Sequence, residues 1–117
     1  MPIRSTQEVF DDHLQLARQG DIETDIARNY AEDCVLLTTY GVFKGHDGVR
    51  EAAVLLDRQL PDARFVYRTR LVYGEIAFLE WTGESEHFRV EDGTDTFLIR
   101  DGKIQVMTFH YTLTTKR

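Results

Sequence analysis

The hydrophobic period of this chain changes at Pro61, and that change constrains the fold more than any other feature. Before Pro61, apolar residues recur every three to four positions in three segments, which is typical of amphipathic helices. After Pro61, apolar and polar residues alternate in four longer segments, which is typical of strands with one buried face. Helices followed by long strands predict an α+β domain, in which three N-terminal helices cover one face of a curved, mostly antiparallel sheet.

The predicted helices occupy residues 5–18, 21–30 and 48–60, and a strand is predicted at 34–40. Ser5 and Glu8 form a capping box at the start of the first helix. Asp21 and Asp47 are the expected caps of the other two helices, and Pro61 ends the third.

Turns between the later strands are expected at 73–75, 91–93 and 101–102, each of which contains a glycine. The alternation then collects large side chains on one face of the sheet: Phe65, Tyr67, Leu71, Leu79, Trp81, Phe97, Ile99, Met107, Phe109 and Tyr111. The other face mixes Arg68, Arg70, Glu80 and Glu84 with Val66, Val72, Phe78, Val106 and His110. Because short helices cannot fill the concave side of a strongly curved sheet, we expect an apolar cavity beneath them.

Composition excludes several classes of function. A chain of 117 residues fits one domain, residues 1–117. Fourteen basic and 20 acidic residues give a net charge of −6, which argues against nucleic acid or an anionic membrane as the partner. The single cysteine, Cys34, permits no internal disulfide, so a cytoplasmic location is expected. No histidine or cysteine spacing indicates a metal site, and no glycine-rich phosphate loop indicates a cofactor.

One acid, Asp95, falls on the aromatic face of the predicted sheet. Burial there disfavours the charged carboxylate and raises its pKa, which suits a proton donor. The alternative is that Asp95 lies in solvent beside the turn expected at 91–93.

Three stretches of the chain resemble the nuclear transport factor 2-like superfamily: Gly20-Asp21 after the first helix, residues 41–50 (GVFKGHDGVR) and residues 95–104 (DTFLIRDGKI). The resemblance covers roughly residues 5–113 and is greatest to the branch of SnoaL-like polyketide cyclases and ketosteroid isomerases. It implies a cone-shaped α+β fold with a deep apolar cavity, and a homodimer formed through the outer face of the sheet.

The resemblance also implies roles for individual residues. In ketosteroid isomerases a neutral Asp and a Tyr bind the developing oxyanion, and a second Asp is the base. Asp95 matches the neutral Asp, His13 occupies the place of the Tyr, and the base position falls on Thr38, which cannot accept a proton from carbon. We therefore select Asp95 and His13 as catalytic candidates. The expected lining of the pocket is Tyr30, Thr38, Tyr40, Trp81, Phe97, Met107, Phe109 and Tyr111.

Three functions remain open at this point. The first is cofactor-independent acid–base chemistry of the isomerase, cyclase or dehydratase type on a small hydrophobic molecule. The second is non-catalytic binding of such a molecule, which the missing base at Thr38 favours. The third is a dimeric interaction module whose outer sheet face meets a partner, and it is compatible with either of the others.

Overall fold

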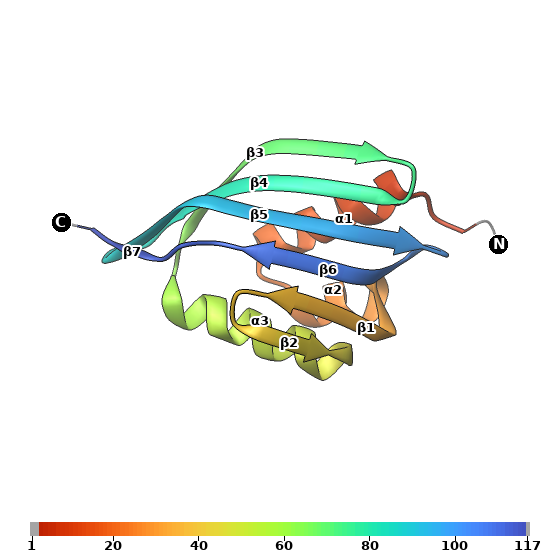
Figure 1. The fold of residues 1–117 in the computed structure, drawn as a ribbon, viewed down its shortest axis with the longest axis horizontal. Coiled ribbons are helices and arrows are strands. Elements are labelled where there is room, and N and C mark those ends of the chain that lie inside the picture. The colour runs from red at the N-terminus through yellow and green to blue at the C-terminus, as the bar shows by residue number, and fades with distance from the viewer. Residues whose placement is uncertain (1–2, 117) are drawn as a thin grey trace.

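Three helices lie on one face of a curved seven-stranded sheet in the computed structural model of this protein, which describes residues 3–116 (Figure 1). The helices are α1 (Thr6–Gln19), α2 (Ile22–Asn29) and α3 (Gly45–Gln59). The strands are β1 (Tyr30–Thr38), β2 (Gly41–Lys44), β3 (Arg64–Tyr73), β4 (Ile76–Glu84), β5 (Phe88–Arg100), β6 (Lys103–His110) and β7 (Thr114–Thr115). The predicted α+β class is confirmed. Residues 1, 2 and 117 of the predicted single domain lie outside the described residues.

The sheet is mixed. Strands β3 to β6 form the predicted antiparallel meander, and the full order is β2-β1-β6-β5-β4-β3, with β7 beside β5. Strand β1 joins this meander through a parallel pairing with β6 and forms an antiparallel hairpin with β2. A parallel neighbour requires a long crossover connection, and the segment from β2 through α3 to β5 supplies it.

The helix boundaries follow the caps in two of three cases. Ser5 and Glu8 form the predicted capping box of α1, with hydrogen bonds of 3.1 and 2.8 Å. Asp21 caps α2 by accepting a hydrogen bond from the Thr24 amide at 3.3 Å. The prediction that Asp47 caps α3 is wrong: the helix already begins at Gly45, and Asp47 lies inside its first turn, where it forms an ion pair with Arg50 at 2.8 Å.

The turn predicted at 91–93 is wrong as well. These residues lie inside β5, and the turn between β4 and β5 falls at 85–87. Gly93 pairs with Trp81, and a Cβ atom at Gly93 would lie 2.2 Å from Cε2 of that indole. The glycine therefore makes room for an aromatic ring packed on the strand, and it is not a turn residue.

A bulge in β3 reverses the predicted faces of its second half. The register shifts between Tyr67 and Thr69, so that Arg70 lies opposite Leu79 on the face toward the helices. Leu71 is consequently 60% exposed on the outer face, whereas Val72 packs against the core. The predicted positions of Leu71, Val72 and Arg70 were wrong because one extra residue in a bulge inverts the alternation that follows it.

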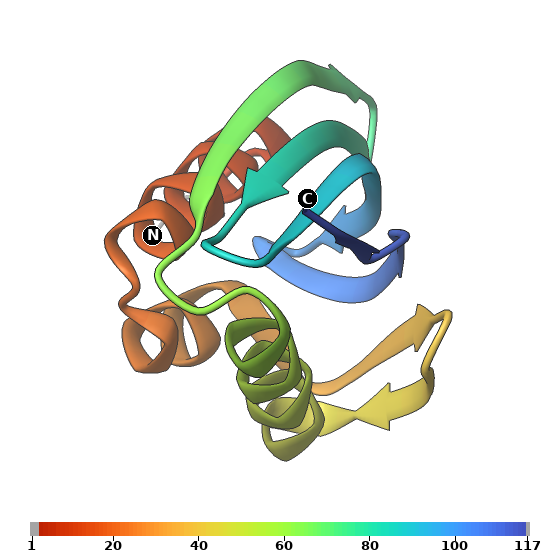
Figure 2. The same ribbon diagram turned by 90° about the vertical axis from the view of Figure 1, so that its left-hand side faces the viewer.

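The helices pack on two different parts of the sheet. Helix α1 contacts β3, β4 and β5, α3 contacts β1 and β2, and α2 contacts both other helices. Figure 2 shows this arrangement, with α2 between α1 and α3 and the strands bending around them. Fully buried side chains such as Phe10, Phe97 and Leu36 form the core between these layers. None of the helices in the described residues is long and apolar enough to cross a membrane.

Candidate functional site

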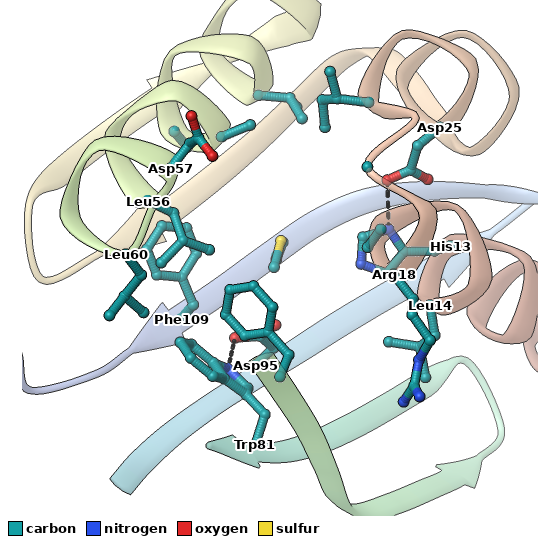
Figure 3. A pocket seen from close by; sticks show the side chains of 18 of the residues that line it. His13, Leu14, Arg18, Asp25, Leu56, Asp57, Leu60, Trp81, Asp95 and Phe109 are labelled. Atoms are coloured by element: carbon teal, nitrogen blue, oxygen red, sulfur yellow. Dashed lines mark hydrogen bonds and ion pairs between the residues drawn. The ribbon is translucent and has the colours of Figure 1, made fainter. Parts of the chain in front are cut away.

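A cavity of about 740 Å³ lies between α1, α3 and the concave face of the sheet (Figure 3). Aliphatic and aromatic side chains form most of its lining. Seven of the residues selected from the sequence are among the lining residues: His13, Tyr30, Trp81, Asp95, Met107, Phe109 and Tyr111. The volume corresponds to that of pockets that enclose small organic molecules.

Asp95 projects from β5 into this cavity (Figure 3), and it is half-buried. Its neighbours across the sheet are Leu79 on β4 and Phe109 on β6. Burial raises the pKa of Asp95 to about 6, although the hydrogen bond from Trp81 and the charge of His13 oppose the rise. Trp81 Nε1 donates to Oδ1 of Asp95 at 3.0 Å, and Oδ2 has no hydrogen-bond partner within residues 3–116. One carboxyl oxygen is thus fixed, and the other is available to a bound molecule.

His13 is buried on α1 and forms a hydrogen bond through Nδ1 with Oδ2 of Asp25, at 2.7 Å. Burial disfavours protonation of the ring, but the charge of Asp25 and this hydrogen bond outweigh it and raise the His13 pKa above its ordinary value. The ring packs edge-on to Tyr30 and Phe97, with centroid distances of 5.8 and 5.1 Å.

The second ring nitrogen of His13, Nε2, makes no hydrogen bond within residues 3–116. Among these residues, no fully buried side-chain nitrogen or oxygen atom lacks a partner. Nε2 is therefore accessible from the cavity that His13 lines. With Nδ1 held by a carboxylate, Nε2 is the atom that can exchange a proton with a bound molecule.

Asp25 was missed by the sequence analysis. It is completely buried on α2, and Oδ1 accepts a hydrogen bond from Asn29 Nδ2 at 2.9 Å. Asn29 is held in turn by Arg4, which donates to its side-chain oxygen at 2.8 Å. The signal was present in the spacing: Asp25 and Asn29 share one face of the helix with Ile22 and Ile26, and that is the face directed inward.

Aromatic side chains form a wall of the cavity at the α3 side. The ring of Tyr111 lies 5.5 Å from Trp81 and is stacked on Phe109 at 5.9 Å, and its hydroxyl donates to the side-chain oxygen of Gln59. Tyr30 donates to the Met107 sulfur at 3.5 Å, and burial raises its pKa well above the ordinary value. A flat apolar wall with few polar atoms suits a planar or ring-shaped molecule.

Three residues expected in the lining lie elsewhere. Thr38 is the last residue of β1, where its hydroxyl donates to the Gly41 carbonyl at 3.0 Å. Tyr40 follows it and is 42% exposed, with its ring packed on Tyr111. Phe97 is fully buried in the core beneath Phe10 and His13. The position that the family resemblance implied for a base therefore lies at the end of β1, outside the cavity.

The other histidines have no place in the lining. His46 Nε2 bonds the Tyr30 carbonyl, and His110 on the outer face bonds Thr39. Within residues 3–116, no group of three or more His, Cys, Asp or Glu side chains is arranged to hold a metal ion.

Comparisons with known structures establish the fold. A candidate ketosteroid isomerase from Kribbella flavida matches with a TM-score of 0.75 at 16% identity, over 96% of this chain and 81% of that one. A candidate polyketide cyclase from Sinorhizobium meliloti matches with a TM-score of 0.72 at 16% identity, over 87% and 93%. An NTF2-like protein of unknown function from Cytophaga hutchinsonii matches with a TM-score of 0.73 at 10% identity, over 96% and 93%.

Sequence comparison identifies the family. No curated protein matches the chain. The sequence profile of the SnoaL-like domain, however, matches residues 10–107, which is most of the chain and includes both His13 and Asp95. This protein belongs to the SnoaL-like domain family.

Proposed function

We propose that this protein binds a small hydrophobic carbonyl compound in the cavity and catalyses a cofactor-independent proton transfer on it, of the isomerase, cyclase or dehydratase type. One observation carries the proposal: Asp95 and the buried His13–Asp25 pair line the same apolar cavity. Each has an atom free for a ligand, Oδ2 of Asp95 and Nε2 of His13. The structural neighbours described as a ketosteroid isomerase and a polyketide cyclase support the same class of chemistry.

The direction of proton transfer follows from the order of the two pKa values. The pKa of Asp95 is about 6, and that of His13 is raised above its ordinary value of 6.5. Between these values Asp95 is ionised and His13 is protonated. Oδ2 of Asp95 is then the base that removes a proton from the carbon beside the carbonyl group, and Nε2 of His13 donates a proton to the carbonyl oxygen as the enol forms.

The surrounding residues support this exchange without taking a proton themselves. The Trp81 N–H stabilises the Asp95 carboxylate and fixes its orientation. Asp25 holds His13 in one orientation and stabilises the imidazolium ring. Two positioned acid–base groups contribute about 10²–10⁴-fold each, and the apolar lining excludes water that would compete for the proton.

The exchange of α-hydrogens for deuterium tests the reaction without knowledge of the natural substrate. The probe is 2-tetralone, a bicyclic ketone, incubated with the protein in D₂O and followed by proton NMR. We expect a rate that rises as the pH passes about 6 and falls again when His13 loses its proton. Asp95→Asn and His13→Gln reduce the rate at least about 100-fold. His87→Gln, at an exposed histidine outside the cavity, leaves it unchanged. A wild-type rate equal to the buffer rate excludes this proton transfer for the ketone tested.

Non-catalytic binding is the second candidate, because Thr38, at the position of the family's base, lies outside the cavity. In this case 2-tetralone raises the melting temperature of the protein but its α-hydrogens do not exchange. The Asp95→Asn variant then binds the ketone as the wild type does.

We also propose a homodimer formed through the outer sheet face, with a second copy of this chain as the partner. None of the three described helices covers this face (Figure 1). It carries exposed apolar side chains on several strands: Leu37, Val66, Leu71, Tyr73 and Ile76. Lys44 and Glu80 on the same face supply charges of both signs, as a self-complementary contact requires.

We propose a cytoplasmic location as well. The lone buried Cys34 supports a reducing compartment such as the cytoplasm.

A further inference from the structure

Two arginines share one aromatic ring at the edge of the cavity. The guanidinium carbon of Arg18 lies 4.6 Å from the centre of the Tyr67 ring, and that of Arg70 lies 5.2 Å from it. Arg18 and Tyr67 line the cavity, and both arginines are exposed to solvent. The Tyr67 hydroxyl is fixed to α1, because it donates to the Leu14 carbonyl at 3.3 Å. The ring therefore holds two positive charges at the edge of the cavity, between α1 and β3.

Neither of these arginines has a carboxylate partner within residues 3–116, although acidic residues outnumber basic ones in this chain. Five other arginines do reach carboxylates, namely Arg4, Arg28, Arg50, Arg89 and Arg100. Arg58, Arg64 and Arg68 form no such pair within residues 3–116, and what distinguishes Arg18 and Arg70 from them is the shared Tyr67 ring at the cavity. Two cations close together repel each other, and the face of one tyrosine compensates only part of that repulsion. A bound anion would compensate the repulsion that remains between the two arginines.

The bulge in β3 places Arg70 in this cluster. Without the register shift after Tyr67, the alternation would direct Arg70 to the outer face, opposite Phe78. With the shift, Thr69 lies opposite Glu80, and Arg70 turns toward the helices and the Tyr67 ring. Bulges beside functional sites commonly redirect a side chain in this way.

We propose that Arg18, supported by Arg70, binds a carboxylate of the ligand at the cavity mouth, so that the natural ligand is an amphipathic acid with an apolar body. This inference rests on the proposed function and defines the substrate class further. At a rise of 1.5 Å per residue, the five positions from His13 to Arg18 span about 7.5 Å along α1. The carboxylate of the ligand therefore lies toward the C-terminal end of α1 from the carbonyl group at His13 and Asp95.

An acidic residue on the other side of the cavity determines the orientation of this ligand. Asp57 on α3 lines the cavity on the side opposite Arg18 (Figure 3). It repels an anion, whereas Arg18 attracts it. The carboxylate is thus expected at the α1 side only, with the apolar body against the aromatic wall.

Two fluorescent probes with the same apolar body test the inference. N-phenyl-1-naphthylamine is neutral, and 8-anilinonaphthalene-1-sulfonate carries one negative charge in place of the ligand's carboxylate. We expect Arg18→Gln to weaken binding of the sulfonate about fivefold, the size expected for one partly solvated charge-assisted contact, and to leave the neutral probe unchanged. Arg70→Gln has a smaller effect in the same direction, and added salt weakens only the sulfonate.

Arg58→Gln is the matched control. Like Arg18, Arg58 lies in the last turn of a helix and has no ion-pair partner in residues 3–116, but it does not line this cavity. Ala53→Phe fills part of the cavity and should weaken the binding of both probes. Such a result would show that the probes bind in the cavity.

Each outcome separates the two proposals. If the neutral probe binds and Arg18→Gln affects the sulfonate no more than Arg58→Gln does, the anion site is wrong and the apolar pocket stands. If neither probe binds the wild type, or if Ala53→Phe has no effect on either, the pocket of the proposed function is wrong as well.

Discussion

The carboxyl group of Asp95 lowers the stability of the folded protein whenever it is ionised. Its folded-state pKa is about 6, because burial penalises the charge, whereas an unfolded chain has the ordinary value near 3.9. The folded state thus holds the proton more tightly. The resulting stabilisation is fully present below about pH 4 and is lost as the pH rises through about 6. A carboxyl group exposed to solvent would not lower the stability of the folded protein in this way.

We therefore predict that Asp95→Asn stabilises the protein at pH 8, by up to about 3 kcal/mol for a shift of about two pKa units. The asparagine keeps an oxygen that accepts the Trp81 N–H, so the gain comes from removal of the buried charge. Urea unfolding at pH 8 and pH 4 measures the effect, which should disappear at pH 4. Equal or lower stability of the variant at pH 8 would show that Asp95 is not a desolvated charge.

Asp25 determines the protonation of His13. In an Asp25→Asn variant, burial acts on the ring without the compensating carboxylate, so the His13 pKa should fall below its ordinary value of 6.5. Titration of the histidine ring protons by NMR measures this directly. The ring signals of His46 and His87, neither of which contacts Asp25, serve as references in the same spectra. A His13 pKa that stays raised in the variant would mean that another group stabilises the imidazolium ring.

Strand β5 contains a glycine, Gly93, that is not part of a turn. Because a Cβ atom at position 93 would overlap the Trp81 indole, Gly93→Ala must move either the strand or the ring. We expect a loss of about 1–3 kcal/mol, the usual range for overpacking, together with a change in Trp81 fluorescence as its hydrogen bond to Asp95 is broken.

Gly74→Ala is the control for this variant. Gly74 also lacks a side chain, but it has a φ of 59° in the β3–β4 turn and has open space around it. This substitution should cost only backbone strain and should leave the Trp81 spectrum unchanged. If the Trp81 fluorescence is also unchanged in Gly93→Ala, the strand moves to accommodate the new Cβ atom and the indole ring does not.

The elements that could be predicted from the sequence are those whose signal is local. The capping box of Ser5 and Glu8 and the alternation along β4 and β6 each arise from neighbouring residues, and the structure agrees with them. The bulges were not predictable in this way, because an extra residue in β3 or β5 is specified by the partner strand.

The residues of the candidate site also divide into those with a local sequence signal and those that depend on tertiary contacts. Asp95 could be selected because it is the one acid on an apolar face, which is visible along a single strand. The contact of Asp25 with His13 joins two helices, and the Arg70–Tyr67 stack follows from the bulge, so both require the tertiary structure. Thr38 was misplaced because a family equivalence was carried over by counting, and the β1–β2 turn begins there in this chain.

At the scale of the whole molecule, the two proposals use different faces of the sheet. The cavity lies on the concave face, beneath α1 and α3, so the proposed ligand would leave the convex face free for a second copy of the chain. The bulge in β3 links the two faces, because the same register shift that brings Arg70 inward turns Leu71 outward. The proposed anion site and the proposed dimer therefore depend on one irregularity in the strand.

We predict that Leu71→Glu converts the proposed dimer into a folded monomer. Leu71 is 60% exposed in the isolated chain, so the charge costs little there, but it would be buried without a partner in a contact between two outer faces. Sedimentation at micromolar concentration should give about twice the monomer mass for the wild type and the monomer mass for the variant. Val54→Glu, an exposed apolar position on α3, should remain dimeric. Val72→Glu should instead reduce stability, because Val72 packs against the core. A wild type that sediments as a monomer would exclude the dimer, and a dimeric Leu71→Glu would move the contact to another surface.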